Sequence, residues 1–214
     1  MEKSIFLIDF DGTIVESNLS EYVLKNFSDS RWLYYHDLLV EKKISLEEAT
    51  KNQYSLIKAS FKDILEQINH VVKIRNNFTE FIHFLLKNNF QLLIVSGGMD
   101  FIIHHVIENL GLGGITEIIS PVLEQRADLS IKVTSPKRFD LAVSDFKLDY
   151  VLHYREMGYR VYYAGDSHSD FEAGLGSDFS FAVRDTDFAS FCREKRIPHS
   201  EFTDFNEIIA FLDD

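Results

Sequence analysis

Short apolar runs alternate with segments of helical periodicity along most of the chain. Residues 5–8 and 92–95 are wholly apolar, which is typical of strands that are buried on both faces of a parallel sheet. Residues 116–120 and 160–164 are further strand candidates. Because helical segments separate these runs, the pattern predicts an α/β protein with a Rossmann-like, doubly wound parallel sheet that is connected by right-handed crossovers.

A long stretch after the first strand candidate, residues 18–77, has helical periodicity and contains neither glycine nor proline. Ser45 and Glu48 fit a capping box, and apolar residues recur at helical spacing between positions 61 and 68. We therefore predict that residues 18–77, called the insert below, form a small all-helical cap domain. Residues 1–17 and 78–214 are predicted to form the α/β core domain.

The second half of the chain carries weaker signals. Residues 122–133 alternate weakly between polar and apolar positions and are expected to form a hairpin. A long helix is expected between Pro136 and Gly158, where it leads into the strand candidate at residues 160–164. These segments continue the α/β pattern of the first half.

Polar turns that contain glycine follow three of the predicted strands, at residues 9–13, 96–98 and 165–170. The carboxyl ends of strands in a doubly wound sheet meet at one crevice, so these turns are expected to form a single site. In the first turn, Asp9 and Asp11 repel each other and therefore favour a hard cation such as Mg²⁺. On this pattern alone, the two acids could instead form an Asx turn that caps the next helix.

Composition excludes some classes of partner. The formal net charge of −12 does not suit nucleic acid, which requires a dense basic surface. The first apolar stretch is broken by Asp9 and is too short to span a bilayer, so no membrane association is expected. A single cysteine, Cys192, cannot form an internal disulfide and is typical of a reducing compartment. We therefore expect a globular, cytoplasmic protein.

The three turns and a lysine between them resemble the haloacid dehalogenase (HAD) superfamily of phosphatases with an aspartate nucleophile. The motifs are DFDGT at residues 9–13, VSGGMDF at 95–101 and GDSHSD at 165–170, and the resemblance covers nearly the whole chain. Within the superfamily the chain is most similar to subfamily IB, which contains phosphoserine phosphatase and the methionine-salvage phosphatase acting on 2-hydroxy-3-keto-5-methylthiopentenyl-1-phosphate. The second of these is the closer likeness. The resemblance implies a HAD-like core with an all-helical cap of the C1 type.

The resemblance assigns the acidic residues of the first and third turns to catalysis and metal binding. It implies that Asp9 attacks phosphorus, and that Asp11 protonates the leaving oxygen and later activates water. It also implies Mg²⁺ held by the Asp9 carboxylate, the Asp11 main-chain carbonyl and Asp166, with Asp170 in support. The expected reaction is hydrolysis of a small-molecule phosphate monoester through an aspartyl-phosphate.

Phosphate binding is expected from the second turn and a lysine. Ser96, the Gly97 amide and the lysine would donate to the phosphoryl oxygens, over which charge spreads in the transition state. Lys132, Lys137 and Lys147 all lie between the second and third turns. Lys147 is preferred because its spacing before the third turn matches the family, whereas Lys137, beside an arginine, is typical of an exposed turn.

The insert is expected to lie above the site and to select the substrate. In the phosphoserine branch a Glu and an Arg hold the amino-acid part of the substrate, but the corresponding positions here are Asn18 and Gln53. Without a fixed charge pair, a zwitterionic substrate loses its best contacts. We therefore expect a small neutral or hydroxylated phosphate ester. The methionine-salvage substrate is one candidate, phosphoserine is an alternative, and other metabolite phosphates remain open.

Other functional assignments explain fewer residues. A Ser hydrolase of the GDS type would use Ser167 as its nucleophile, but it accounts only for residues 165–167. A non-enzymatic phospho-receiver would explain acids beside a lysine but not the insert, and an inactive scaffold would not need the complete set of polar residues.

Two further groups of residues have both a structural and a functional interpretation. His168 has no second histidine at metal-ligand spacing and is expected to be a loop residue at the mouth of the site. Trp32, Tyr34 and Tyr35 are expected to lie in the core, with contact to the substrate as the alternative.

Overall fold

The computed structural model describes residues 3–140, 142–143 and 145–213, and a parallel sheet lies at its centre. The six-stranded sheet has the order β3-β2-β1-β6-β7-β8, and every neighbouring pair in it is parallel. Its strands are β1 (Lys3–Ile8), β2 (Gln91–Val95), β3 (Glu117–Ile119), β6 (Tyr159–Gly165), β7 (Phe179–Val183) and β8 (His199–Phe202). The predicted α/β fold with a doubly wound parallel sheet is confirmed.

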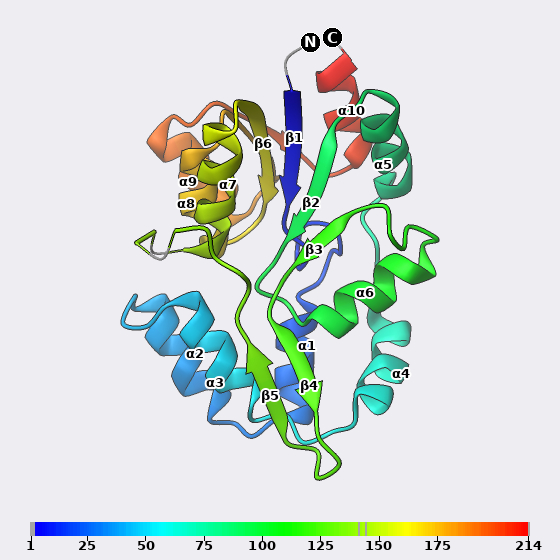
Figure 1. Ribbon diagram of the computed structural model, residues 1–214, viewed down its shortest axis with the longest axis vertical. Helices are drawn as coiled ribbons and strands as arrows, with labels where there is room; N and C mark the ends of the chain where they lie inside the picture. The colour runs from blue at the N-terminus through cyan, green and yellow to red at the C-terminus, as the bar shows by residue number, and fades with distance from the viewer. Residues whose placement is uncertain (1–2, 141, 144, 214) are drawn as a thin grey trace.

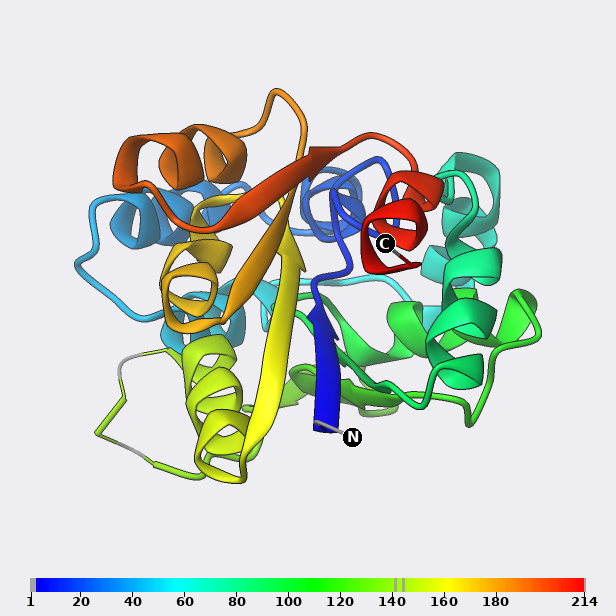
Figure 2. The same ribbon diagram turned by 90° about the horizontal axis from the view of Figure 1, so that it is seen from above.

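Helices cover both faces of this sheet, as Figures 1 and 2 show. One layer consists of α5 (Phe78–Lys87), α6 (Asp100–Asn109) and α10 (Phe205–Asp213), and the other of α7 (Phe146–Glu156), α8 (Phe171–Gly176) and α9 (Asp187–Lys195). Along β1, Phe6 and Ile8 pack into the first layer, whereas Ile5 and Leu7 pack into the second. This burial on both sides explains why β1 is a continuous apolar run instead of an alternating one.

The insert supplies the helices that follow β1. They are α1 (Leu19–Phe27), α2 (Trp32–Val40), α3 (Leu46–Tyr54) and α4 (Phe61–Val71), and they lie beyond the carboxyl ends of the strands (Figure 1). Asn18, Ser45 and Ser60 cap α1, α3 and α4, each accepting a hydrogen bond from the amide three residues further on. The helical character of the insert therefore agrees with the prediction, while its exact boundaries as a domain remain a prediction.

A hairpin outside the main sheet is formed by β4 (Val122–Gln125) and β5 (Ile131–Thr134), as predicted. It extends from the core and lies beside the insert (Figure 1). The Gln125 side chain accepts a hydrogen bond from the Phe61 amide at 3.1 Å and donates one to the Ala59 carbonyl at 2.8 Å. The predicted division places this hairpin in the core domain and remains a prediction, and these contacts connect the hairpin with the insert.

The helix expected to follow Pro136 directly begins only at Phe146, so this part of the prediction was wrong. The Asp145 side chain caps the helix by accepting from the amides of its first turn. The preceding loop is stabilised by Asp149, which accepts from the amides of Phe139 and Asp140 at 2.7 and 2.9 Å. These local carboxylate bonds favour a loop over a longer helix, and they place Lys147 in the first turn of α7.

Candidate active site

Asp9 follows β1 directly and lies beside Lys147, Asp166 and Asp170 of the predicted site. Carboxylate oxygens of Asp9, Asp166 and Asp170 all lie within 4.8 Å of one another, and these residues are called the carboxylate cluster below. The Lys147 ammonium lies 3.1 Å from Asp9 Oδ1 and 2.7 Å from Asp170 Oδ1, and its side chain is almost fully buried. The structure therefore brings together groups from the first turn, the third turn and α7.

Asp170 organises this cluster through both of its oxygens. Its Oδ1 accepts from Lys147 Nζ at 2.7 Å and from the Tyr163 hydroxyl at 2.6 Å, and its Oδ2 accepts from the amides of Asp166 and Ser167. Burial alone would raise the pKa of Asp170, but the Lys147 charge and these hydrogen bonds hold it below its ordinary value. With both oxygens engaged, Asp170 is suited to hold the lysine and the third turn in place.

The pKa values of Asp9 and Asp166 are shifted in the opposite direction to that of Asp170. Burial is the main cause that raises the pKa of Asp9 to about 7 and that of Asp166 to about 8, and repulsion from Asp170 adds to both shifts. Asp166 Oδ1 is buried and has no hydrogen-bond partner among the described residues, whereas Asp9 Oδ1 has the Lys147 ammonium as its neighbour at 3.1 Å. Buried carboxylates this close together, one of them with an oxygen that lacks a donor, fit a hard divalent cation such as Mg²⁺.

Gly12 allows the first and third turns to approach each other closely. Its φ is +74°, and a Cβ at this position would lie 2.1 Å from Asp166 Oδ2. Any side chain here would therefore displace Asp166 from the cluster, in addition to straining the backbone.

The carboxylate of Asp11 is directed toward the insert and not into the carboxylate cluster. It accepts hydrogen bonds from the amides of Leu19 and Ser20 at 2.9 and 3.3 Å, and from the Ser20 hydroxyl at 2.6 Å. Burial raises the pKa of Asp11, and the bonds from Ser20 and Leu19 oppose this rise. Its side chain thus contacts the first turn of α1, while the expected metal contact through its main-chain carbonyl remains a prediction.

Ser96 lies at the carboxyl end of β2 and is almost fully buried. Its hydroxyl accepts from the Gly98 amide at 3.1 Å. A Cβ on Gly98 would lie 3.2 Å from Asp11 Oδ2, 3.3 Å from Ser96 Oγ and 3.4 Å from Ser20 Oγ. The turn at residues 96–98 therefore adjoins Asp11 and the beginning of the insert.

Helix α3 of the insert covers the same turn. The Tyr54 hydroxyl, at its carboxyl end, donates to the Gly97 carbonyl at 2.7 Å. Leu46, at its amino end, has a methyl carbon 3.4 Å from where a Gly97 Cβ would lie. Sequence reasoning missed Ser20, Leu46 and Tyr54, because nothing in their local pattern distinguishes them from other residues of amphipathic helices.

Asn18 and Gln53, the two positions expected to read the substrate, form hydrogen bonds within the insert. The Asn18 side chain accepts from the Glu21 amide at 2.7 Å as the N-cap of α1. The Gln53 side chain is buried and donates to the Trp32 carbonyl at 3.2 Å. Both side chains thus have a structural partner, and a contact with substrate remains a prediction.

The remaining candidates lie at the surface or in the core. Lys132 is exposed and pairs with Glu124, and Lys137 is exposed. Trp32 is buried as expected, whereas Tyr34 is 62% exposed and is not part of the core. Tyr35 is partly buried.

His168 and Ser167 bear on the hydrolase alternative. The His168 side chain is 71% exposed and its Nδ1 lies 3.2 Å from Asp187 Oδ2, which agrees with a loop residue. The Ser167 hydroxyl contacts Ser169 and Asp170. The adjacent imidazole is thus paired with a carboxylate instead of Ser167, which does not favour Ser167 as an activated nucleophile.

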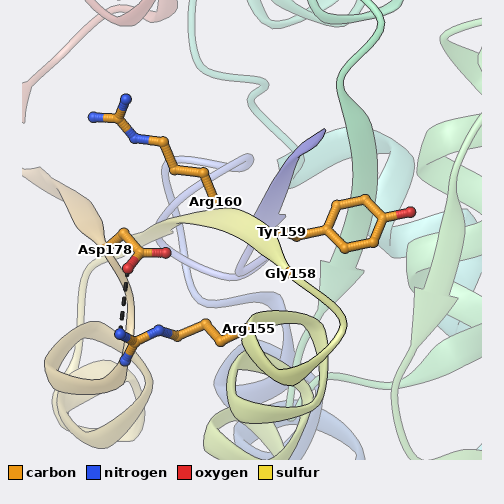
Figure 3. A pocket seen from close by; sticks show the side chains of 5 residues that line it. All are labelled: Arg155, Gly158, Tyr159, Arg160 and Asp178. Carbon is orange, nitrogen blue, oxygen red and sulfur yellow. Dashed lines mark ion pairs between the residues drawn. The ribbon is translucent and has the colours of Figure 1, made fainter. Parts of the chain in front are cut away.

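A surface pocket of about 330 Å³ lies elsewhere on the molecule, and Figure 3 shows the residues that line it. Tyr159 begins β6, so this pocket is at the amino end of that strand, opposite the end where the turns meet. Arg155 within it pairs with Asp178 at 3.4 Å. None of the predicted site residues lines this pocket.

The chain is similar to known proteins over most of its length. A family model described as haloacid dehalogenase-like hydrolase matches residues 6–174. The chain is 30% identical to a 2-hydroxy-3-keto-5-methylthiopentenyl-1-phosphate phosphatase from Bacillus velezensis, over 95% of this chain and 87% of the relative. It is 26% identical to the protein of that name from Brevibacillus brevis, over 99% of this chain and 96% of the relative.

Solved structures show the same fold. A phospho-aspartyl intermediate analogue of phosphoserine phosphatase superposes with a TM-score of 0.71 and 18% identity, covering 99% of both chains. A substrate-bound phosphoserine phosphatase gives a TM-score of 0.70 with 17% identity, again over 99% of both chains. At this level of identity, the likeness concerns the fold alone.

Proposed function

The chain belongs to the haloacid dehalogenase-like hydrolase family and is a phosphatase, and we propose that it hydrolyses a small-molecule phosphate monoester with Mg²⁺ through an aspartyl-phosphate on Asp9. One observation carries this proposal. Asp9 lies beside the Lys147 ammonium and within 4.8 Å of the Asp166 and Asp170 carboxylates at the carboxyl ends of the strands.

Asp9 is the proposed nucleophile. Its carboxylate oxygen forms a bond to phosphorus while the bond from phosphorus to the ester oxygen breaks, and the leaving alcohol takes a proton from Asp11. Water then attacks the phosphorus of the aspartyl-phosphate, Asp11 accepts a proton from that water, and phosphate and the free Asp9 carboxylate are restored. The bonds from Leu19 and Ser20 hold the Asp11 carboxylate in one orientation.

Lys147 and the turn at residues 96–98 are proposed to bind the phosphoryl oxygens. Burial alone would lower the pKa of Lys147, but Asp170 and Asp9 raise it, so the ammonium stays charged. In a buried site a fixed positive charge stabilises the transition state strongly, because water does not screen it. Ser96 Oγ and the Gly97 amide are the further proposed donors.

The residues that would hold Mg²⁺ are Asp9, Asp166 and the Asp11 main-chain carbonyl. The unpartnered Asp166 Oδ1 and the closeness of the Asp9, Asp166 and Asp170 carboxylates support this assignment. Asp170 has both oxygens engaged and would keep Asp166 and Lys147 in position. When bound, the ion would neutralise negative charge on the phosphoryl group and on the carboxylates.

The insert favours a substrate without a zwitterionic group. Three described side chains of the insert that lie at the turn of residues 96–98, Ser20, Leu46 and Tyr54, are neutral. Asn18 and Gln53 do not restore a charge pair. We therefore propose 2-hydroxy-3-keto-5-methylthiopentenyl-1-phosphate, the substrate named for the relatives, as the first candidate, and phosphoserine as the alternative.

The test is hydrolysis of 4-nitrophenyl phosphate, followed by a panel of phosphorylated metabolites that includes phosphoserine. We expect turnover that depends on Mg²⁺, is lost in Asp9→Asn and is retained in Ser167→Ala. Activity that survives Asp9→Asn and disappears in Ser167→Ala would instead support the Ser hydrolase. A higher kcat/KM for phosphoserine than for the neutral esters would overturn the substrate proposal but not the phosphatase.

We also propose a cytoplasmic location, on the ground that Cys192 is the single cysteine of the chain. Among the described residues, every helix is too short or too polar to cross a lipid bilayer. Fractionation of cells that produce the protein would test this location directly.

A further inference from the structure

Arg75 is a buried cation outside the proposed chemistry. The described charged residues that are buried are Asp9, Arg75, Lys147, Asp149 and Asp170. Asp9, Lys147 and Asp170 belong to the proposed site. Asp149 accepts hydrogen bonds from the loop before α7. Arg75 is 8% exposed, and no carboxylate in the described part of the chain forms an ion pair with it. Glu16 and Asp166 are near enough to favour its charged form without forming an ion pair, and because burying a charge is costly, its remaining contacts need an explanation.

The guanidinium of Arg75 binds main-chain carbonyls. Its Nη2 donates to the Gly12 carbonyl at 2.6 Å and its Nε donates to the Thr13 carbonyl at 2.8 Å, while Nη1 reaches the Thr203 carbonyl at 3.4 Å. The first two carbonyls are consecutive and are bound by the planar fork of one guanidinium. A lysine ammonium lacks this fork geometry.

The turn that Arg75 binds carries the proposed acid and base. The Phe10 carbonyl accepts from the amides of Thr13, Ile14 and Val15 at 2.9–3.2 Å, so the chain folds tightly on itself immediately after Asp9. Asp11 and Gly12 lie inside this turn. A shift of the turn would therefore move the Asp11 carboxylate and would also change the contact of Gly12 with Asp166.

Arg75 also lies where the insert returns to the core. Its own amide donates to the Ile14 carbonyl at 2.8 Å, and the Glu16 amide donates to the Lys73 carbonyl at 2.9 Å. Val15 and Ile74 form an isolated β-bridge between the same two segments. The segment that leads into the insert, residues 14–16, is therefore paired with the segment that returns from it, residues 73–75. The Arg75 guanidinium binds this pair of segments to the turn.

We infer that Arg75 is a positioning residue: its guanidinium fixes the turn at residues 10–15, and so orients Asp11 for proton transfer, at the point where the insert joins the core. The catalytic part of this inference rests on the proposed function. Because Arg75 acts on Asp11 and does not contact the turn at residues 96–98, its loss should lower kcat and leave the KM for a phosphate ester nearly unchanged.

The first test compares Arg75→Ala and Arg75→Lys with the wild type, using 4-nitrophenyl phosphate and saturating Mg²⁺. We expect kcat to fall by about 10- to 100-fold in both variants, the range typical of a misplaced catalytic group. Low millimolar guanidinium should restore part of the kcat of Arg75→Ala, whereas methylammonium should not. Arg155→Ala, which removes a surface arginine paired with Asp178, is the matched control and should retain wild-type kcat.

The second test measures hydrogen exchange and does not depend on activity. Arg75→Lys keeps the charge and is the variant to use if Arg75→Ala does not fold. In this variant the amides of residues 10–17 should exchange faster than in the wild type, while the amides of β2 stay protected. Each of three results would overturn the inference. The first is an unchanged kcat per folded molecule, and the second is a folded Arg75→Ala variant that guanidinium does not rescue. The third is unchanged hydrogen exchange at residues 10–17. A wild type without phosphatase activity would overturn the proposed function, and the exchange measurement would still decide whether Arg75 orders the turn.

Discussion

The two sides of the candidate site are built from different interactions. On the core side, Asp9, Lys147 and Asp170 form a buried set of opposite charges at 2.7–3.1 Å, supplied by the turn after β1, by α7 and by the turn after β6. On the insert side, Asp11 contacts the Ser20 hydroxyl and main-chain amides, and the turn at residues 96–98 contacts a tyrosine hydroxyl. At these contacts the core thus supplies the charges, and the insert supplies neutral hydrogen bonds that order Asp11 and the turn at residues 96–98.

This difference predicts how strongly each side responds to substitution. Charges in a site that excludes water interact several times more strongly than charges at a surface. A neutral hydrogen bond contributes only about 0.5–1.5 kcal/mol, because its groups would otherwise bind water. Changes on the core side should therefore abolish turnover, while changes on the insert side should weaken it.

The largest effect is expected for Asp9→Asn, which removes the nucleophile of the core side. We expect kcat for 4-nitrophenyl phosphate to fall by about 10³-fold or more, as for other enzymes that lose a covalent nucleophile. Asn has nearly the same shape, so circular dichroism and the melting temperature should show a folded protein. A folded Asp9→Asn variant with more than a tenth of wild-type kcat would show that the core side does not contain the nucleophile.

The next largest effect is expected for Lys147→Ala. This change leaves Asp9 and Asp170 as buried charges without their cation, and it should lower kcat by about 10²- to 10³-fold. It should also lower the free energy of unfolding by about 3–5 kcal/mol in urea titrations, the cost of breaking a buried pair. Lys137→Ala is the control, because that side chain is exposed. Its kcat should stay within about two-fold of the wild type.

A smaller effect is expected when the pH is changed. The free energy of unfolding should depend on pH through two carboxylates of the core side, Asp9 and Asp166. Burial raises the pKa of Asp9 from 3.8 to about 7 and that of Asp166 from 3.8 to about 8. In the metal-free protein these groups keep protons that the unfolded chain releases near pH 4, so the free energy of unfolding should fall as the pH rises through 7 and 8. Mg²⁺ competes with these protons and should raise the melting temperature more at pH 8 than at pH 6.

Scanning calorimetry in EDTA and in Mg²⁺ between pH 5.5 and 8.5 would measure this dependence. Asp166→Asn should flatten both the pH dependence of the metal-free protein and the response to Mg²⁺. Asp37→Asn, a change at an exposed acid of the insert, should leave both unchanged. A metal-free protein that becomes more stable as the pH rises through 7 would contradict the arrangement of the carboxylate cluster.

The core side could be predicted from the sequence because its pattern is local. Asp9, Ser96 and Asp166 are early polar residues after strand-forming runs, and the topology of a parallel sheet brings such positions together. Lys147 is expected at the site from its spacing, and the structure places its ammonium beside Asp9 although α7 begins several residues later than predicted. The start of that helix could not be read from periodicity, because side-chain bonds of Asp145 and Asp149 with nearby amides determine it.

The insert side could not be predicted in the same way, because its contacts join distant segments. Tyr54 and Gly97 are separated by 43 positions, and Arg75 and Thr13 by 62. Ser20, Tyr54 and Arg75 are ordinary residues in their local sequence, and only the packing of the insert on the core gives them their partners. For the same reason the sequence pattern does not show that Gln125 of the hairpin binds Phe61 and Ala59 of the insert.

The smallest effect is expected for Tyr54→Phe, which tests the insert side directly. Phe keeps the ring packed and removes only the hydroxyl that donates to Gly97, so the Gly97 carbonyl loses one neutral bond. We expect kcat/KM to fall by about three- to ten-fold, consistent with one neutral hydrogen bond, with most of the change in KM because the substrate would meet a less ordered turn. Tyr34→Phe, at an exposed tyrosine of the same insert, should leave kcat/KM unchanged. If Tyr54→Phe lowered kcat as much as Lys147→Ala does, the hydroxyl would be acting on the reacting groups, and the distinction between a charged core side and an ordering insert side would not hold.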